Sequence, residues 1–492
     1  MRFSVALTTL AAAATLAAPA LADGGYYGGA QGARAAGRSG AFVARADDPT
    51  AIVYNPAGLA GINGTLLMVG NRFSYNGYDY KRADTLNWGD PTATQTMAPA
   101  ISFPQVSNSA TAQPLDPLFV YANNFGLPNW GFAGGVLAAP GTSRLDFPVG
   151  GGQRYMMLSR EAVFLDGVVS AAWKHHDTFG VGATAMWIVV PRLDYSLLID
   201  GTPFVQTANN VSSPLDMIAQ TKGWDPFTFN AIVGAWYRPV PFLQFGVAGQ
   251  VVPAKVKTRS KLSVTPLDTT MGEVALARDG FPKNDVNVIL PLPLMARLGA
   301  RYRHLSVARE IFDVELDVEY ETWSRVNEFV LDTNNLVGTF QGAEVNLGRI
   351  GIAKHWQDTV AVKLGGDVAV TERLALRAGG FYESAVAPNA YANVDFPGGA
   401  MVGGSVGGSL LMYGHFEVSI AYQLRKMLDI NLAEADARVY QQVPASACTP
   451  PYTDPNFCHT QFLGQPSPQI NAGSYRAISH YLSLALLVRF GS

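Results

Sequence analysis

The residues best suited to chemistry are carboxylates that alternate with apolar residues in the stretch FDVELDVEYE, 312–321. They are Asp313, Glu315, Asp317, Glu319 and Glu321. In a β-strand these side chains share one face, with neighbours about 6.6–7 Å apart. Two such neighbours could form the acid and base of a hydrolase. No other motif supports an enzyme, and a row is not a pair, so we interpret the row as a charged surface.

Arginines that could neutralise this acidic row occur before it in the chain. In RLGARYR, period two places Arg297, Arg301 and Arg303 on one face. Five acids exceed three arginines, and buried unpaired charge costs several kcal/mol, so further cations are expected. The candidates are Arg34, Arg38, Arg45, Arg373 and Arg377. We hypothesise that the three upstream arginines (34, 38 and 45) dock an N-terminal segment onto the row.

That segment contains ADDPTAIVYNPAGLAG, 46–61. It is short, rich in Gly and Ala, and predicts a helical turn that ends at Asn55–Pro56. A partly helical segment before many strands suggests a plug inside a pore. Asn55, Pro56 and Ala57 could shift to open the path, or could form only a local turn, since Asn bonds nearby backbone and Pro restricts φ. Both interpretations remain open.

Strands must position these groups, and the composition indicates how. The chain of 492 residues is 48% hydrophobic and 15% charged. After the N-terminus it has no apolar run of about 18 residues, which leaves a closed β-barrel as the membrane-spanning alternative. Period-two patterns predict fourteen strands of an all-β membrane protein. They lie near 64–80, 115–123, 130–140, 161–174, 178–194, 225–238, 241–258, 292–304, 311–323, 358–370, 373–384, 400–411, 414–426 and 475–490.

The connections alternate between short turns and long loops. The long ones are predicted near 195–224, 259–291, 324–357 and 427–474. This asymmetry is typical of outer-membrane barrels with short periplasmic turns. Residues 1–22 have the basic start, apolar stretch and A-x-A site of a cleaved signal peptide, as opposed to a retained anchor. We therefore predict a signal peptide at 1–22, a plug at 23–63 and a barrel at 64–490.

The two cysteines, Cys448 and Cys458, lie amid turn residues in one predicted outer loop. In an exported chain this spacing favours a local disulfide. The alternative is a metal pair, for which only His459 is a further ligand nearby. The sequence predicts neither a metal site nor a cofactor.

Four blocks together resemble the FadL/TodX (OmpP1) family of outer-membrane transporters for long-chain fatty acids and hydrophobic compounds. They are RSGAFVARADDPTAIVYNPAGLAG, Trp224–Ser260, Pro293–Asn327 and Trp356–Glu383. The resemblance implies a fourteen-stranded barrel with an N-terminal hatch. It also implies an outer groove, a lumenal path and a lateral exit through a gap in the wall, beside an inward kink in the third strand. In this chain the kink could fall at Gly134–Gly135 or at Pro140, or Pro140 could simply end the strand.

These observations predict a transporter without enzymatic activity in the outer membrane of a Gram-negative bacterium. Its expected ligand is a long-chain fatty acid or another hydrophobic small molecule, taken up passively. Contact with outer-membrane lipid and lipopolysaccharide and a monomeric state are expected. The net charge of −3 argues against a nucleic-acid partner. The alternatives are a general diffusion porin, tested by conductance, and an outer-membrane lipolytic enzyme, tested by a lipase assay.

Overall fold

The computed structural model describes residues 30–84, 102–138, 142–199, 216–306, 309–340, 342–396, 398–440 and 469–490. The predicted signal peptide, Pro140 and both cysteines lie outside these ranges. Within them, no helix has the length and apolar character needed to cross a membrane.

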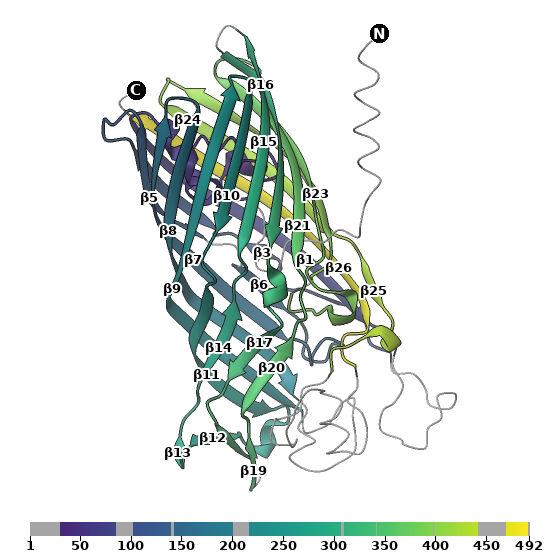
Figure 1. Ribbon diagram of the computed structural model, residues 1–492. Helices are drawn as coiled ribbons and strands as arrows, with labels where there is room; N and C mark the ends of the chain where they lie inside the picture. Colours follow the sequence, from purple (N-terminus) through teal and green to yellow (C-terminus); the bar gives the residue numbers. More distant parts are fainter. Residues whose placement is uncertain are drawn as a thin grey trace.

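The strands form one closed antiparallel barrel of fourteen strands, which confirms the predicted fold class (Figure 1). Some barrel strands are continuous: β1 (Thr65–Arg82), β7 (Ser159–His175), β8 (Phe179–Ile199), β9 (Met217–Val240), β22 (Leu374–Glu383), β23 (Met401–Met412) and β26 (Gly473–Phe490). The second and third consist of pieces: β2 (Val106–Ser107), β3 (Ala112–Gln113) and β4 (Pro117–Asn123), then β5 (Trp130–Ala138) and β6 (Ser143–Asp146).

The other barrel strands are also interrupted along their length. Their pieces are β10 (Leu243–Gln250) and β11 (Lys255–Pro266), β14 (Asp285–Pro291) and β15 (Met295–Ser306), β16 (Arg309–Glu321) and β17 (Glu328–Asp332), β20 (Arg349–Ala353) and β21 (Thr359–Ala369), β24 (Phe416–Met427) and β25 (Ile430–Leu432). The barrel closes because β1 pairs with β26 along its length, from Thr65 opposite Phe490 to Arg82 opposite Gly473.

Every predicted strand position contains an observed strand, but several strands extend further than predicted. β9 has 24 residues and pairs with β8 as far as Ile199 opposite Met217. Much of the predicted loop near 195–224 is therefore strand. The hydrocarbon layer needs only about 9–11 residues per strand, and beyond it the outward face no longer has to be apolar. The alternation of apolar and polar residues therefore weakens beyond the hydrocarbon layer, although the strands remain hydrogen-bonded to each other there.

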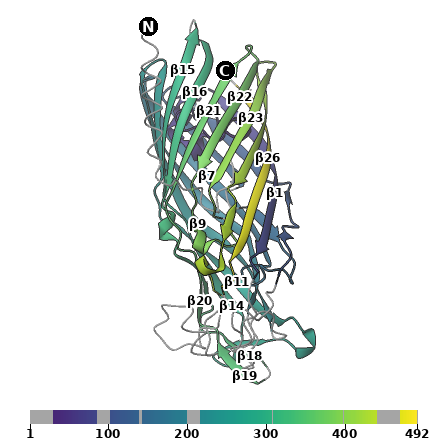
Figure 2. The same cartoon turned by 90° about the vertical axis from the view of Figure 1, so that its right-hand side faces the viewer.

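A small second sheet lies at the long-loop end, beyond the barrel and opposite Phe490 (Figures 1 and 2), and short helical turns lie in the connections between strands or strand pieces. The sheet contains β12 (Ala275–Arg278), β13 (Phe281–Pro282), β18 (Val337–Phe340) and β19 (Ala343–Asn346). The turns are η3 (Thr269–Met271), η4 (Trp323–Arg325), η5 (Asn389–Tyr391) and η6 (Glu434–Asp436).

The N-terminal segment lies inside the barrel near the end where β26 terminates (Figure 1). We call residues 30–63 the plug. It contains α2 (Ala33–Ala36), α3 (Ala51–Tyr54) and η2 (Pro56–Gly61). Asn55 is extended between the last two, with φ −155°, as expected for a residue before proline. Plug residues such as Phe42 and Ile52 share one buried apolar cluster with Val120 and Val168 of the wall.

Candidate functional site

The acidic row lies on the lumenal face of β16. Its five carboxylates are all buried, whereas the alternating apolar residues Phe312, Val314, Leu316, Val318 and Tyr320 are exposed on the outside of the barrel. A lipid-embedded barrel requires this sorting, because its outer surface contacts hydrocarbon. The carboxylates can therefore be neutralised only by groups inside the lumen.

Arg38 of the plug is the centre of this neutralisation. Its side chain is fully buried, with 0% exposure. The guanidinium donates to Asp313 Oδ1 at 2.8 Å, to Glu315 Oε2 at 2.9 Å and to Asp367 Oδ1 at 2.6 Å. Its Nε donates to the Ala41 carbonyl of the plug at 2.8 Å. The planar fork of arginine suits such multiple carboxylate contacts, so this residue joins the plug to two strands at once.

The plug backbone also binds the acidic row. The N–H groups of Phe42 and Val43 donate to Asp317 Oδ2 at 2.7 and 3.0 Å. The N–H groups of Ala44 and Arg45 donate to Glu315 Oε1 at 2.6 and 3.2 Å. Consecutive N–H groups that converge on a carboxylate form a favourable anion site. The row therefore receives backbone donors as well as arginines, which the sequence did not indicate.

Arg45 and Arg34 have different partners. Arg45 lies 3.1 Å from Asp313 Oδ1 and 3.3 Å from Asp367 Oδ2. Arg34 does not contact the row: it pairs with Asp47 at 3.0 Å, Asp48 at 3.5 Å and Glu417 of β24 at 3.8 Å. The prediction that Arg34 docks on the row is wrong, because α2 packs against β23 and β24.

Glu319 of the row reaches the plug through Arg297. It pairs with Arg297 and, at 3.2 Å, with Lys363. Arg297 also donates to the Val53 carbonyl of the plug at 2.7 Å.

Two further contacts of the row come from outside the plug. Arg301 of β15 pairs with Asp313 and with Glu310, both in β16. Glu321 accepts a hydrogen bond from Trp323 Nε1.

The residues of the NPA motif connect the plug to β9. Asn55 Nδ2 donates to the carbonyls of Val43 and Ala235, at 2.9 and 3.0 Å. Its Oδ1 accepts the N–H of Ala57 at 3.2 Å, which caps η2. The Ala57 carbonyl accepts Trp236 Nε1–H at 3.0 Å. The NPA motif therefore forms a local turn and also contacts the barrel wall.

A set of inward-facing glycines allows the plug backbone to approach the wall. A Cβ atom at any of them would lie within 3.2 Å of a plug atom. We call this set the glycine cradle: Gly131, Gly182, Gly234, Gly246, Gly299, Gly365, Gly379 and Gly407. At Gly182, for example, the Cβ would lie 2.6 Å from Ala57 N. Glycines inside strands were the available signal, since they mark close backbone approach.

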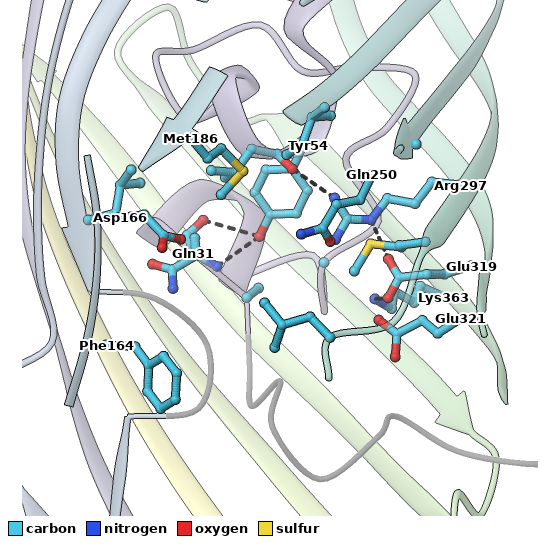
Figure 3. A pocket seen from close by; sticks show the side chains of 18 of the residues that line it. Gln31, Tyr54, Phe164, Asp166, Met186, Gln250, Arg297, Glu319, Glu321 and Lys363 are labelled. Atoms are coloured by element: carbon cyan, nitrogen blue, oxygen red, sulfur yellow. Dashed lines mark hydrogen bonds and ion pairs between the residues drawn. The ribbon is translucent and has the colours of Figure 1, made fainter. Parts of the chain in front are cut away.

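An inner cavity lies beside the plug on the side of the long loops (Figure 3). Tyr54 extends into it, and its hydroxyl is bonded to both the N–H and the carbonyl of Gln31, at 2.8 and 3.2 Å. Gln31 Nε2 donates to the Ala138 carbonyl, the last residue of β5, at 2.8 Å. The plug is therefore tied directly to the end of a barrel strand.

An outer cavity lies further toward the long loops, and its lining is almost entirely apolar. Its wall includes Leu193, Leu290 and Phe329. Arg160 also lines it, with its guanidinium carbon 4.0 Å from the centre of the Phe396 ring. Lys354 nearby is paired with Asp395.

Among the described residues, the ladder of backbone pairs is interrupted between the second and third strands. β4 and β5 pair only from Asn123 opposite Phe132 to Leu118 opposite Leu137. The next described backbone bond between these strands runs from Ser109 N–H to the Asp146 carbonyl, at 2.9 Å. Residues 110–117 and 142–145 are not paired with each other among the described residues. We call this interruption the wall break.

Two of the predicted kink positions are not part of the wall break. Gly134 and Gly135 lie in regular β5 and pair with β4 on one side and with β7 on the other. The prediction of a kink there is wrong, because both neighbours maintain the ladder through these residues. β5 ends at Ala138, and Pro140 lies outside the described residues.

The described residues contain no group of His, Cys, Asp and Glu that could hold a metal ion. The proposed Cys448–Cys458 disulfide falls outside the described residues and stays a prediction.

Comparison with solved structures places this architecture among known transporters. A FadL homologue of Pseudomonas aeruginosa is 16% identical, with a TM-score of 0.72 over 95% of this chain and 100% of that one. The toluene transporter TbuX of Ralstonia pickettii is 14% identical, with a TM-score of 0.60 over 94% and 98%. The toluene transporter TodX of Pseudomonas putida is 13% identical, with a TM-score of 0.60 over 95% and 100%. These likenesses show the fold.

The family comparison adds the sequence relationship. No curated protein matches the chain. The family model described as outer membrane protein transport protein (OMPP1/FadL/TodX) matches residues 150–449. The chain therefore belongs to this family of Gram-negative outer-membrane barrels that transport hydrophobic compounds.

Proposed function

We propose that this protein takes up long-chain fatty acids or similar hydrophobic molecules passively. The ligand enters the outer cavity, reaches the inner cavity, and leaves sideways through the wall break after the plug shifts. The observation that carries this proposal is the position of the inner cavity: its lining includes the plug residue Tyr54 and Leu137 and Ala138, where β5 ends. Opening toward the membrane suits an apolar ligand, which gains nothing from an aqueous exit.

The inward face of β7 supports a continuous path. Arg160, Ala162, Phe164 and Asp166 alternate on this face, and all four are buried. The first lines the outer cavity and the last two line the inner cavity. Asp166 lies six positions after Arg160, so about 20 Å of strand separates them. The outer cavity, with one cation in an apolar wall, suits a fatty acid whose carboxylate meets Arg160. We also propose that the barrel acts as a monomer.

Locking the plug tests the proposed route. Ser39 of the plug and Ser405 of β23 have their hydroxyl oxygens 2.8 Å apart. In a background with Cys448 and Cys458 replaced by serine, Ser39→Cys with Ser405→Cys should form a disulfide. We expect oxidation to reduce uptake of a radiolabelled fatty acid into cells at least about tenfold, because the plug can no longer shift, and reduction to restore it.

Each single cysteine variant serves as the control and should transport normally under both conditions. Equal uptake by the oxidised and reduced double variant would contradict a path that requires plug movement.

Replacing Arg160 tests whether its guanidinium binds the carboxylate of the fatty acid. Arg160→Leu should weaken dodecanoate binding about tenfold to a hundredfold, since hydrogen bonds to charged groups contribute about 1.5–3 kcal/mol. The uncharged methyl dodecanoate should bind equally well to both proteins, and calorimetry of the purified barrel measures both ligands. Arg192→Leu is the matched control, because Arg192 is half exposed and pairs with Glu161 and Asp194. An equal loss for acid and ester would show that Arg160 only supports the fold.

A further inference from the structure

One buried carboxyl group in the inner cavity is not used by the plug. Asp166 of β7 is only 4% exposed and lines this cavity. Among the described residues it has neither a hydrogen bond nor an ion pair, and its Oδ1 is fully buried without a partner. Figure 3 shows Asp166 on the opposite side of Tyr54 from Arg297, Glu319 and Lys363.

The surroundings of Asp166 are apolar on every strand that adjoins it. Its cross-strand neighbours are Leu137 of β5 and Ile188 of β8, and both line the same cavity. Its neighbours on the same face of β7 are Phe164 and Val168, both buried. A carboxyl group in such a setting is costly unless a donor reaches it.

The polar groups that lie closest in the plug already have partners. The Tyr54 hydroxyl is bonded to the N–H and the carbonyl of Gln31, and the Gln31 amide donates to Ala138. The cations across the cavity are paired as well: Arg297 and Lys363 with Glu319, and Arg425 with Glu383. These plug groups and cations therefore leave Asp166 without a donor.

We propose that Asp166 is a specificity-determining residue that receives a hydrogen-bond donor on the ligand. The favoured ligand is an apolar molecule with one hydroxyl group, such as an alkylphenol. At this position, next to the wall break, a hydroxyl group on the ligand would give the buried carboxyl group a hydrogen-bond partner, whereas a hydrocarbon would leave it without one. This inference rests on the proposed function, since it assumes that hydrophobic ligands occupy the inner cavity.

Two ligands that differ in one group test it: ethylbenzene and 4-ethylphenol. Calorimetry of the purified barrel gives their affinities. In the unaltered protein we expect 4-ethylphenol to bind about tenfold more tightly than ethylbenzene, since a hydrogen bond to a buried group that otherwise has no partner gives about this factor. Asp166→Leu should remove that preference and leave ethylbenzene binding within about twofold. Asp166→Asn, which keeps the shape and an acceptor oxygen, should retain part of the phenol preference.

Glu161→Gln is the control, because Glu161 lies on the same strand but faces outward and pairs with Arg192 at 3.1 Å. It should not change either affinity. If Asp166→Leu binds both ligands as the unaltered protein does, the role of Asp166 is refuted while the proposed function stands. If the unaltered protein binds dodecanoate but shows no preference for 4-ethylphenol over ethylbenzene, this inference is likewise refuted. If it binds neither dodecanoate nor ethylbenzene, the proposed function fails, and this inference fails with it.

Discussion

Replacing Arg38 with methionine is expected to release the plug and to raise the ion conductance of the barrel. Arg38 contacts Asp313, Glu315 and Asp367 while fully buried, so its removal leaves these carboxylates short of a partner. Breaking a buried ion pair in this way costs about 3–5 kcal/mol. We expect the open fraction to rise about a hundredfold to a thousandfold, measured as single-channel conductance in planar bilayers.

The control for Arg38 is an arginine of the same barrel that does not contact the plug. Arg309 is 42% exposed and lies 3.9 Å from Glu372. Arg309→Met should conduct as the unaltered protein does. Arg38→Lys should give an intermediate conductance, because one ammonium group cannot reproduce the fork that reaches three carboxylates. If Arg38→Met conducts no more than Arg309→Met, the anchoring role is excluded.

Adding one methyl group at Gly379 is expected to displace the plug nearly as effectively as Arg38→Met does. Its Cβ would overlap the Arg38 backbone, which belongs to the same anchor. Overpacking of this kind costs about 1–3 kcal/mol, and the upper end applies where backbone must move. We expect Gly379→Ala to raise conductance about tenfold to a hundredfold and to reduce hydrogen-exchange protection of residues 33–61.

The adjacent residue gives a matched control on the same strand. Gly380 faces the other side of β22, and its Cβ would come no closer than 3.6 Å to another atom, the Gly403 carbonyl oxygen. Gly380→Ala should leave both conductance and exchange protection unchanged. Equal effects of the two substitutions would mean that the strand itself, and not the seating of the plug, is sensitive to a methyl group.

Together the Arg38 and Gly379 substitutions test separately how charged contacts and close packing hold the plug in place. Arg38 supplies the favourable contacts, and the glycine cradle supplies the space in which those contacts can form. The contacts of Arg38 and the glycine cradle meet on β16, β21 and β22, where Asp313, Asp367 and Gly379 surround Arg38. A plug that is held by charge can also be released locally, without unfolding the barrel around it.

The fold was readable from the sequence because a barrel strand obeys a local rule. Each crossing strand must present apolar side chains to lipid at every second residue, as β16 does from Phe312 to Tyr320. The same alternation placed the five carboxylates on the lumenal face. Charge balance then indicated that arginines of the N-terminal segment were needed, and Arg38 and Arg45 do contact the row.

The partners of these groups could not be read in the same way, because they depend on how distant strands are brought together. Asp367 joins Asp313 and Glu315 as a carboxylate partner of Arg38 through the register of β21 against β16, in which it lies opposite Asp313. Arg34 pairs with Glu417 because α2 packs against β24. The inner cavity and the isolation of Asp166 likewise involve the plug together with β5, β7 and β8. Alternation along a strand is a local property of the chain, whereas each of these contacts joins residues far apart in sequence.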